Sequence, residues 1–365
     1  MISLSKLYGA LDERFPFARA ESWDKVGLLV GDKSASVSRA LVCYEVTEAA
    51  LDLAQERGCD VVVAYHPLIF RPLEKLDFSD RTARLCARLI RAEQNLICVH
   101  TALDGATPPH ALGDALARQL GIEGARVHKA SGTQKLVQLV YFVPESHLEK
   151  TREAAWQQGA GAIGHYDEAS FALQGSGTFR PLEGATPAEG NVGTRAETNE
   201  WRVELLVPAE SAGRVLEAIK AAHPYEEVAY YMTALQNSDD NQQYGPLRLA
   251  SVPDATLFEW VERAKTQLKI PSVRVAMAEE GTSYTKVACS PGSGASFISS
   301  LPHGTIFISG DFKHHDALAA QARGVALIDV THAATETMTV DMMAEAIEDC
   351  VEVVRATPRN PFDFL

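Results

Sequence analysis

The stretch ALVCYEVTEAALDLAQERGCDVVVAYHPLIF, residues 40–70, determines the fold class of this 365-residue chain. It opens with an apolar, β-branched run over 40–46, which predicts a strand. Thr47 can cap a following helix, and Gly58 can end it. The next run, VVVAYH at 61–66, shows no polar alternation, as expected for a strand buried on both faces. Strand, helix and strand in this order predict an α/β architecture with a largely parallel sheet.

A second segment, GTIFISGDFKHHDALAAQARGVALIDVTHAATE at residues 304–336, repeats this layout 266 residues further along the chain. At that offset the aligned positions are 54–58 with 320–324, His66 with His332, and Glu45 with Asp311. Each segment therefore delivers a histidine just past the end of its second strand. In α/β sheets, ligands bind beyond the carboxyl ends of the strands. We therefore expect two similar α/β halves that face each other and form one metal-binding body.

Between these halves the sequence pattern changes. Residues 134–173 predict a strand, a Val-Pro turn, a helix, a Gly-rich turn and a strand, and residues 197–235 predict the same order. Two βαβ units of this size indicate an inserted α+β domain of the ferredoxin-like kind.

The insert has polar segments in its middle and at its end. The Gly- and Pro-rich stretch LEGATPAEGNVGTRAE, 182–197, predicts a loop, and QNSDDNQQYGP, 236–246, is typical of a return linker. The expected domains are an N-terminal half over 1–130, an insert over 134–236 and a C-terminal half over 245–365.

The composition excludes several classes of protein. Hydrophobic residues make up 46% of the chain and charged residues 22%, which is typical of a folded chain. The net charge of −14, without a run of Lys or Arg, argues against nucleic acid as the main partner. No apolar stretch reaches the about 18 residues of a membrane span, and no signal peptide is recognisable, so we expect a cytoplasmic protein with no membrane partner. The six cysteines lack any Cys-x-x-Cys pair, which excludes zinc-finger sites and favours free core thiols.

Candidate metal ligands occur just beyond the predicted strands of both segments. His332 and Glu336 lie four residues apart in a stretch with helical periodicity, so a helix would place both on one face. The alternative is the solvated start of a surface helix. His66 lies where an apolar strand meets a proline turn, at the sheet edge where sites form. Its alternative role is to cap local backbone groups.

A third cluster, His100 and Asp104 in CVHTALDGA, lies at the end of the apolar run NLICVH, 95–100, and just beyond it. Asp104 precedes a glycine, so it is either a ligand carboxylate or an ordinary turn aspartate. We expect His100 to hold a neighbouring ligand in place rather than to bind the ion itself. Asp24 either orients such ligands or caps a turn.

The combination of histidines and carboxylates limits which metal ions the site would favour. Mixed imidazole and carboxylate ligands suit Zn, Mn, Fe, Co or Ni better than Ca or Mg. Two carboxylates with histidines can also bridge two ions about 3.5–4 Å apart, as in hydrolytic two-metal sites. We therefore expect one or two divalent ions per chain.

Taken in order, the motifs resemble those of the Nif-three-like dinuclear-metal proteins, which are catalogued as GTP cyclohydrolase 1 type 2 homologues. In the α/β halves the matching stretches are ESWDKVGLLVGD, AYHPLIF, VHTALDGA, GSGASFI, SGDFKHHDAL and DVTHAATE. Two more, GSGTFRP at 175–181 and HPYEEVAYY at 223–231, resemble signatures of an insert found in longer members. That insert is similar to the PII and CutA ferredoxin-like domains, which form trimers.

The resemblance implies a set of metal ligands. By position these are His66, Asp104, His332 and Glu336. Tyr65 stands where the family has a further histidine, and a phenol with a pKa of about 10 is a poor ligand. Tyr65 therefore ligates weakly, hydrogen-bonds a bound water or leaves a single-metal site. His315 matches a motif histidine and is the candidate catalytic acid or base; the start of a helix is its alternative role.

Two functions fit these residues. The first is a metal-dependent hydrolase, in which metal-activated water attacks a small-molecule substrate such as a nucleotide or another phosphoester. The family label implies GTP, but no guanine-reading motif is recognisable. The second is a non-enzymatic metal-binding protein with a regulatory or interaction role. The resemblance also implies a homohexamer, a trimer of dimers in which the insert forms the trimer contact.

Overall fold

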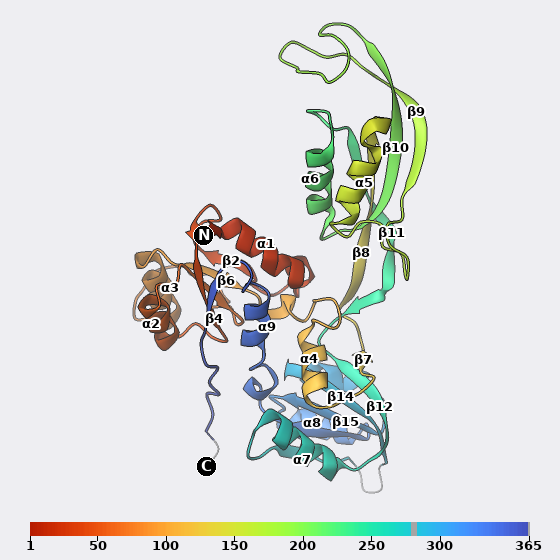
Figure 1. Cartoon of the computed structure of the whole chain (residues 1–365). Coiled ribbons are helices and arrows are strands. Elements are labelled where there is room, and N and C mark those ends of the chain that lie inside the picture. Colours follow the sequence, from red (N-terminus) through yellow and green to blue (C-terminus); the bar gives the residue numbers. More distant parts are fainter. Residues whose placement is uncertain (279–282, 364–365) are drawn as a thin grey trace. The chain divides into compact units, whose positions relative to one another are not determined.

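A computed structural model describes residues 1–278 and 283–363 of the chain (Figure 1). The chain forms two compact units. Unit 1 combines Met1–Gly132 with Tyr244–Leu365, and unit 2 is the intervening Thr133–Gln243. Both units mix helices and strands.

The first sheet of unit 1 has five strands in the order β17-β4-β5-β6-β2. Their bounds are β17 (Glu352–Arg355), β4 (Arg39–Cys43), β5 (Val61–Ala64), β6 (Asn95–Cys98) and β2 (Gly27–Val30). The strands β17, β4, β5 and β6 are parallel, and only β2 pairs antiparallel. The α/β architecture predicted from the sequence is therefore confirmed.

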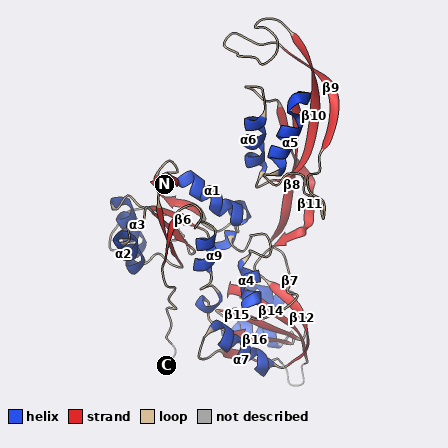
Figure 2. Ribbon diagram, in the orientation of Figure 1, coloured by secondary structure: helices blue, strands red, loops and turns tan. Residues whose placement is uncertain are grey.

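Helices cover both faces of this sheet (Figure 2). They are α1 (Leu4–Arg14) and α9 (Thr339–Glu345) on one face, and α2 (Glu48–Glu56) and α3 (Arg81–Arg91) on the other. The predicted cap is present, since the Thr47 side chain accepts a hydrogen bond from the Ala50 N–H at 3.1 Å. All four residues of β5 are fully buried, which explains why its sequence shows no polar alternation.

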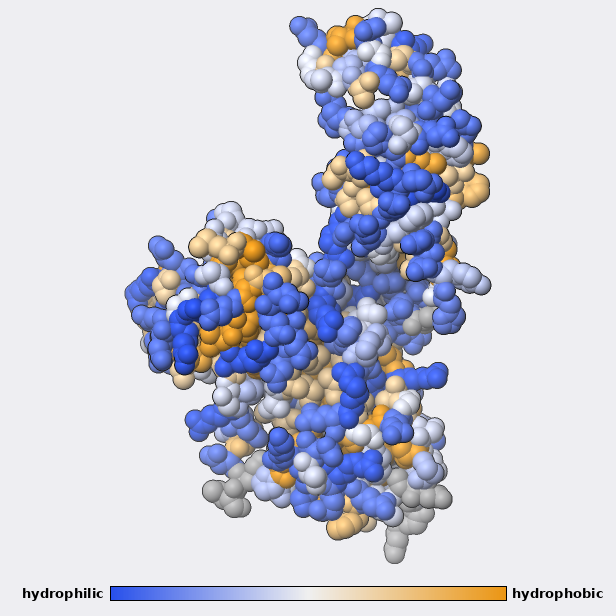
Figure 3. Space-filling model, in the orientation of Figure 1, coloured by the Kyte–Doolittle hydropathy of each residue, from blue (hydrophilic) through white to orange (hydrophobic). Residues whose placement is uncertain are grey.

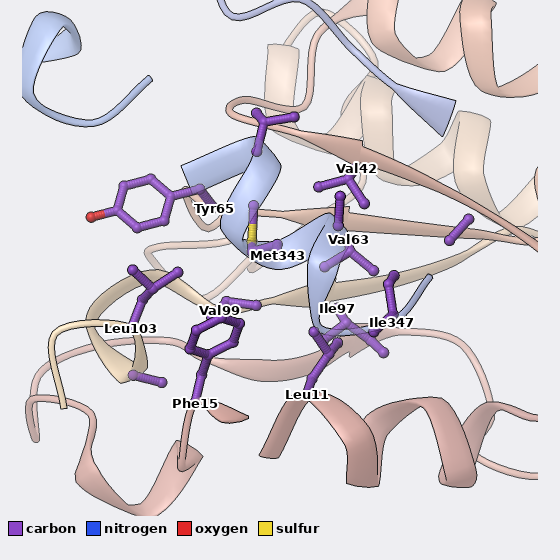
Figure 4. Close-up of a cluster of buried hydrophobic side chains, with 14 of the residues drawn as sticks. Leu11, Phe15, Val42, Val63, Tyr65, Ile97, Val99, Leu103, Met343 and Ile347 are labelled. Atoms are coloured by element: carbon purple, nitrogen blue, oxygen red, sulfur yellow. The ribbon is translucent and has the colours of Figure 1, made fainter. Parts of the chain in front are cut away.

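The α1 side of the sheet carries the core shown in Figure 4. Its labelled side chains come from α1, the sheet, the segment after β6, and the C-terminal α9 region. The Tyr65 ring lies at the edge of this cluster, and its hydroxyl points away from the other labelled side chains (Figure 4). This orientation turns the polar atom of the side chain away from the apolar cluster.

The second sheet of unit 1 has six strands in the order β13-β16-β15-β14-β12-β7. Their bounds are β13 (Arg274–Ala276), β16 (Val325–Asp329), β15 (Thr305–Gly310), β14 (Tyr284–Ser293), β12 (Arg248–Ala255) and β7 (Arg126–Val127). The three central strands β14, β15 and β16 are parallel. The helices of this part are α4 (Leu112–Gln119), α7 (Leu257–Leu268) and α8 (His314–Gln321).

Each sheet of unit 1 has an edge strand that comes from the other side of the insert in the sequence. The C-terminal β17 pairs with β4 in the first sheet, although it follows the whole second sheet in the chain. Conversely, β7 and α4 precede the insert in the chain but belong to the second sheet: β7 pairs with β12 at its edge, and α4 packs into its core. The division between the sheets therefore does not follow the division of the sequence at the insert.

The 266-residue repeat corresponds to equivalent elements. β4 begins at Arg39 and β15 begins at Thr305, which are 266 residues apart. In each case a helix follows, and the next strand lies parallel to the first. The histidines beyond β5 and β16 therefore start from matching ends of parallel strands.

Unit 2 has a four-stranded sheet in the order β11-β8-β10-β9. The elements in chain order are β8 (Gly132–Val143), α5 (Leu148–Trp156), β9 (Phe171–Phe179), β10 (Ala196–Pro208), α6 (Ala212–Ala222) and β11 (Tyr230–Tyr244). β10 pairs antiparallel with both β8 and β9, and the two helices share one core with the sheet. The polar stretch after β9 lies outside helix and strand up to Arg195, as the sequence predicts.

One sequence prediction for this unit is wrong. Residues 236–244, expected to be a return linker, continue β11 to Tyr244. β11 is the outermost strand of its sheet, where one side of the backbone faces away from any partner strand. Polar composition in such a strand resembles that of a linker, and this accounts for the error.

The remaining short elements connect these layers. β1 (Ile2–Ser3) pairs with β3 (Ser36–Val37), and 3₁₀ helices span Phe17–Arg19, His100–Ala102, Glu145–His147, Ala295–Ser300 and Ala333–Thr335. All six cysteines are free, and five are buried. Within residues 1–278 and 283–363, no helix is long and apolar enough to cross a membrane.

Candidate metal centre

Three of the predicted ligands converge in unit 1. His66 lies two residues beyond β5, while His332 and Glu336 flank the 3₁₀ helix Ala333–Thr335 that follows β16. One ligand atom from each of the three residues lies within 4.8 Å of the others. The Oε2 atom of Glu336 is 3.0 Å from His332 Nε2 and 3.6 Å from His66 Nε2. Both imidazoles thus direct the same ring nitrogen toward one carboxylate.

His332 and Glu336 meet across a tighter turn than the sequence predicts. The expected α-helix does not begin at His332; the chain makes a 3₁₀ turn there, and α9 begins only at Thr339. The Thr335 hydroxyl donates to the His332 carbonyl at 2.7 Å and accepts the Gly292 N–H at 2.8 Å. Threonine hydroxyls that bond nearby backbone compete with regular helix, and this contact holds the turn.

The other nitrogen of each imidazole faces a carboxylate. Asp311 Oδ2 lies 2.7 Å from His332 Nδ1, and Glu45 Oε1 lies 3.4 Å from His66 Nδ1. These are the two pairs that the 266-residue offset aligns. A carboxylate on Nδ1 fixes the tautomer that leaves Nε2 free to bind a metal. The two sides of the centre are therefore built on the same plan.

The charges around His332 change its protonation. Burial alone would lower its pKa, but the hydrogen bonds and negative charges of Glu336 and Asp311 raise the pKa of His332 to about 9. On the other side, contact with His66 lowers the pKa of Glu45 below its usual value, against the opposing effect of burial. Glu45 thus remains ionised, and without a bound cation His332 holds a proton between the Glu336 and Asp311 side chains.

Two tyrosines hold the Glu336 carboxylate. The Tyr44 hydroxyl donates to Oε2 at 2.7 Å, and the Tyr65 hydroxyl donates to Oε1 at 3.3 Å. Their rings stack with centroids 5.8 Å apart and planes 12° apart. Burial and then the charge of Glu336 raise the pKa of both phenols well above the usual value, so both stay protonated. Tyr65 thus orients a carboxylate here, and its role as a metal ligand stays a prediction.

Tyr44 has no role in the sequence prediction. It follows β4 next to Glu45, and a single tyrosine after a strand carries no spacing signal of its own. Its contact with Glu336 joins residues 292 positions apart, so only the folded structure identifies it.

Asp104 lies near this group but outside the set of three. Its Oδ1 atom is buried and makes no hydrogen bond within the described part of the chain. Burial, followed by the negative charge of Glu336, raises the pKa of Asp104 well above its usual range. A buried carboxylate in this state needs a proton or a cation. Its surroundings therefore fit a bound metal ion, although its place among the ligands stays a prediction.

Asp24 and His100 form a supporting pair. Asp24 Oδ1 lies 2.7 Å from His100 Nδ1, and the Thr101 N–H donates to Asp24 Oδ2 at 3.0 Å. Burial opposes ionisation of Asp24, but the hydrogen bonds from His100 and Thr101 lower its pKa overall. The His100 ring lies 5.2 Å from the His66 ring. The same carboxylate-on-Nδ1 arrangement thus occurs a third time beside the centre.

The predicted catalytic residue His315 lies in the first turn of α8 and is exposed. Its ring packs against His314 at 5.3 Å. Within the described residues, His315 forms no hydrogen bond, ion pair or ring contact with His66, His332 or Glu336. Its role as an acid or base stays a prediction.

The backbone around the centre is tightly constrained. Gly292 has a φ of +61°, and a Cβ there would lie 2.5 Å from Glu336 Oε1 and 3.3 Å from His332 Nε2. Three non-glycine residues beside the centre, His100, Asp311 and Thr331, also have positive φ. Such strained conformations persist only where the surrounding structure enforces them, and they cluster at functional sites.

Comparisons with known proteins find relatives that match nearly the whole chain. The family described as Duf34/NIF3 (NGG1p interacting factor 3) matches residues 2–361. A Mycobacterium bovis protein named GTP cyclohydrolase 1 type 2 homolog is 33% identical over 340 residues, covering 92% of this chain and 88% of its own. A protein of the same name from Halalkalibacterium halodurans is 32% identical over 320 residues, covering 87% and 85%. The crystal structure of a Bacillus cereus protein related to NIF3 matches with a TM-score of 0.80 and 28% identity, covering 100% of this chain and 99% of that one.

Proposed function

Because the chain belongs to the Duf34/NIF3 family, we propose that it is a metal-dependent hydrolase. In this proposal the metal centre is built by His66, Asp104, His332 and Glu336. The observation that carries it is the convergence of two imidazole Nε2 atoms on one buried carboxylate, with all three ligand atoms within 4.8 Å.

The residues around the centre fit a divalent cation. Asp311 holds His332 in the tautomer that binds metal, Glu45 lies near the same ring nitrogen of His66, and the Tyr44 hydroxyl fixes Glu336. The orphaned Oδ1 of Asp104 supplies a further anionic oxygen that lacks any partner in the described chain. Imidazole and carboxylate ligands together favour Zn, Mn, Fe, Co or Ni, with one or two ions bound.

A divalent ion held by these residues would supply an activated water, acidified to near neutrality, for attack on the phosphorus of a phosphoester or on a ring carbon. The chain's own residues supply the geometry. Asp311 keeps the Nε2 atom of His332 pointed at the centre, Glu45 lies behind the His66 ring, and Gly292 leaves the space that Glu336 occupies. His315, near the carboxyl end of β15, is the proposed proton donor or acceptor.

For the substrate we propose a small phosphoester such as a nucleotide. The support is the chemistry of the centre and the name of the Mycobacterium bovis relative, GTP cyclohydrolase 1 type 2 homolog. That name makes GTP the first compound to test.

The direct test combines metal analysis with a hydrolysis screen. Purified protein is loaded with Zn or Mn, its metal content per chain is measured, and turnover of GTP, other nucleotides and generic phosphoesters is assayed. We expect turnover that falls at least about 100-fold in Asp104→Ala. Glu13→Ala, which removes an exposed carboxylate from α1, is the matched control and should change neither quantity. Turnover that survives in Asp104→Ala would exclude this centre as its source.

The position of Tyr65 favours a second candidate function. Its phenol donates to Glu336 instead of offering an imidazole, so the centre has one fewer strong ligand than the family motif implies. A non-enzymatic protein that senses metal or mediates an interaction fits this loss. Stoichiometric metal binding without turnover of any compound in the screen would support it.

For unit 2 we propose a ferredoxin-like module that assembles as a trimer. The support is its βαββαβ order, its sheet order β11-β8-β10-β9, and the position of α5 and α6 on one side of the sheet (Figure 1). Hydrophobic side chains lie at its surface among hydrophilic ones (Figure 3). The side chains of Phe171 and Leu173 in β9 are exposed. Pairing of unit 1 with a second copy would complete a cytoplasmic homohexamer, a trimer of dimers.

Deletion of the insert tests this assembly. Ser131 N–H donates to the Tyr244 carbonyl at 2.8 Å, so the two ends of unit 1 lie together and a short Gly-Ser link can join them. We expect light scattering to show a hexamer for the full chain and a dimer after deletion. A monomeric full chain, or a deletion variant that stays hexameric, would disprove the proposed arrangement.

A further inference from the structure

Unit 2 contains a cavity of about 520 Å³ that the proposed hydrolase does not use. Its walls come from the end of β9 and the loop after it, from Phe142 of β8, from Glu200 of β10 and from the segment before β11. Both sequence motifs of the insert, 175–181 and 223–231, contribute to the lining. This volume lies within the range of small-molecule sites, about 300–1,000 Å³.

Glu200 gives the cavity a carboxylate in a prepared position. A Cβ at Gly177 would lie 2.4 Å from Glu200 Oε2, so the bare backbone of β9 makes room for this group. Glu200 is half-buried, and within the described residues it forms no ion pair. Burial raises the pKa of Glu200 above its usual value; the neighbouring Tyr225 hydroxyl opposes this effect, and the charge of Glu189 adds to it. The carboxylate therefore lacks a compensating cation.

Tyr225 places a hydroxyl beside this carboxylate. The Tyr225 N–H donates to His223 Nδ1 at 3.1 Å, and His223 Nε2 donates to the Phe142 carbonyl at 2.9 Å. This chain of contacts fixes the tautomer of His223 and the backbone position of Tyr225. The buried Tyr225 hydroxyl lies beside the side chains of Glu200 and Thr198, and neither contact is a well-formed hydrogen bond. A polar atom in that state is available to a ligand.

The lining combines negative charge with aromatic rings. Four glutamates face one basic side chain, Arg180, among the lining residues. The aromatic lining residues are Phe142, Phe179, Tyr225 and Tyr231. An organic cation is attracted both by negatively charged side chains and by the π faces of aromatic rings, so this lining favours such a ligand.

We propose that this cavity binds a small planar organic cation with an amidinium or guanidinium group. Glu200 accepts paired N–H bonds from that group, the Tyr225 hydroxyl hydrogen-bonds its edge, and the aromatic side chains pack against its flat face. This site lies wholly in unit 2, so its existence does not depend on the metal centre or on the proposed hydrolase activity.

The test uses benzamidine as the probe and benzamide, its neutral analogue of the same shape, as the comparison. Calorimetric titration of the full chain, with and without added metal, should give saturable benzamidine binding and benzamide binding that is at least about tenfold weaker. Glu200→Gln should weaken benzamidine binding about tenfold, because it keeps the shape and removes the charge. Tyr225→Phe should weaken it about two- to fivefold. Glu183→Gln, in the same loop region but outside the lining, should have no effect.

The outcomes separate clearly, provided that thermal melting shows each variant to be folded. No saturable binding of benzamidine, equal binding of benzamide, or full affinity in Glu200→Gln would each overturn the proposal. A change in oligomeric state in Tyr225→Phe without any benzamidine binding would show that the cavity is a contact between copies, and would overturn it as well.

Discussion

Replacing Asp311 with asparagine removes a negative charge that lies 2.7 Å from His332 Nδ1 and leaves a hydrogen-bond acceptor in its place. We expect the affinity for Zn or Mn to fall about tenfold, which corresponds to about 1.4 kcal/mol, because carboxylates behind a metal-binding histidine typically contribute 10- to 100-fold. Asp311→Ala removes the hydrogen-bond acceptor as well, so its affinity for Zn or Mn should fall further, by about 100-fold.

The matched comparison is Glu45→Gln, at the equivalent position of the repeat. Glu45 lies 3.4 Å from His66 Nδ1, which makes no well-formed hydrogen bond, so the expected loss is only about two- to threefold. The structure therefore predicts an order of effects, with Asp311 ahead of Glu45, in addition to their direction.

The assay is competition between the protein and a chelator of known affinity, with thermal melting to confirm that each variant is folded. A larger loss in Glu45→Gln than in Asp311→Asn would refute the geometric argument. Unchanged affinity in both folded variants would refute the assignment of His66 and His332 as ligands.

Three further predictions address the centre. Tyr65→His should raise the bound metal per chain, because a neutral imidazole replaces a protonated phenol beside Glu336; elemental analysis showing two ions in both proteins would count against it. Gly292→Ala should abolish metal binding, since its Cβ would lie 2.5 Å from Glu336 Oε1, and the φ of +61° adds about 1–2 kcal/mol of strain measurable by denaturant unfolding; wild-type affinity in this variant would contradict the structure. Because the pKa of His332 is raised to about 9, metal must displace its proton at neutral pH, so affinity should rise with pH up to about 9. Calorimetry in two buffers should detect about one proton released per ion, and a pH-independent affinity would argue against His332 as a ligand.

The sequence predicts the two strand–helix–strand segments because their signals are local. Apolar runs, a capping threonine and a terminal glycine each act within a few residues. The 266-residue offset also relates distant positions, because it aligns Glu45 with Asp311 and His66 with His332. In the structure, the Glu45–His66 and Asp311–His332 contacts are equivalent at this offset. The resemblance supplied the ligand set, of which the structure brings three members into one group.

Other features leave no local trace in the sequence. Tyr44 acts through a carboxylate 292 residues away, and nothing near it in the chain distinguishes it from a core tyrosine. Residues 236–244 carry the polar composition of a linker, yet their backbone extends an outer strand. The 3₁₀ turn at His332 depends on a hydroxyl contact with Gly292, which periodicity does not record.

The exchange of outer segments between the two sheets of unit 1 affects how this unit unfolds. β17 closes the first sheet beside β4, with Glu352 Oε2 2.6 Å from an Arg39 guanidinium nitrogen, while α4 and β7 complete the second. Removing β17 from the first sheet, or α4 and β7 from the second, would expose core side chains to water. The two sheets should therefore unfold as one cooperative unit. His66 and His332 project from different sheets, and they would then separate only in that global event. Amide hydrogen exchange in β5 and β16 should accordingly report one shared free energy of opening.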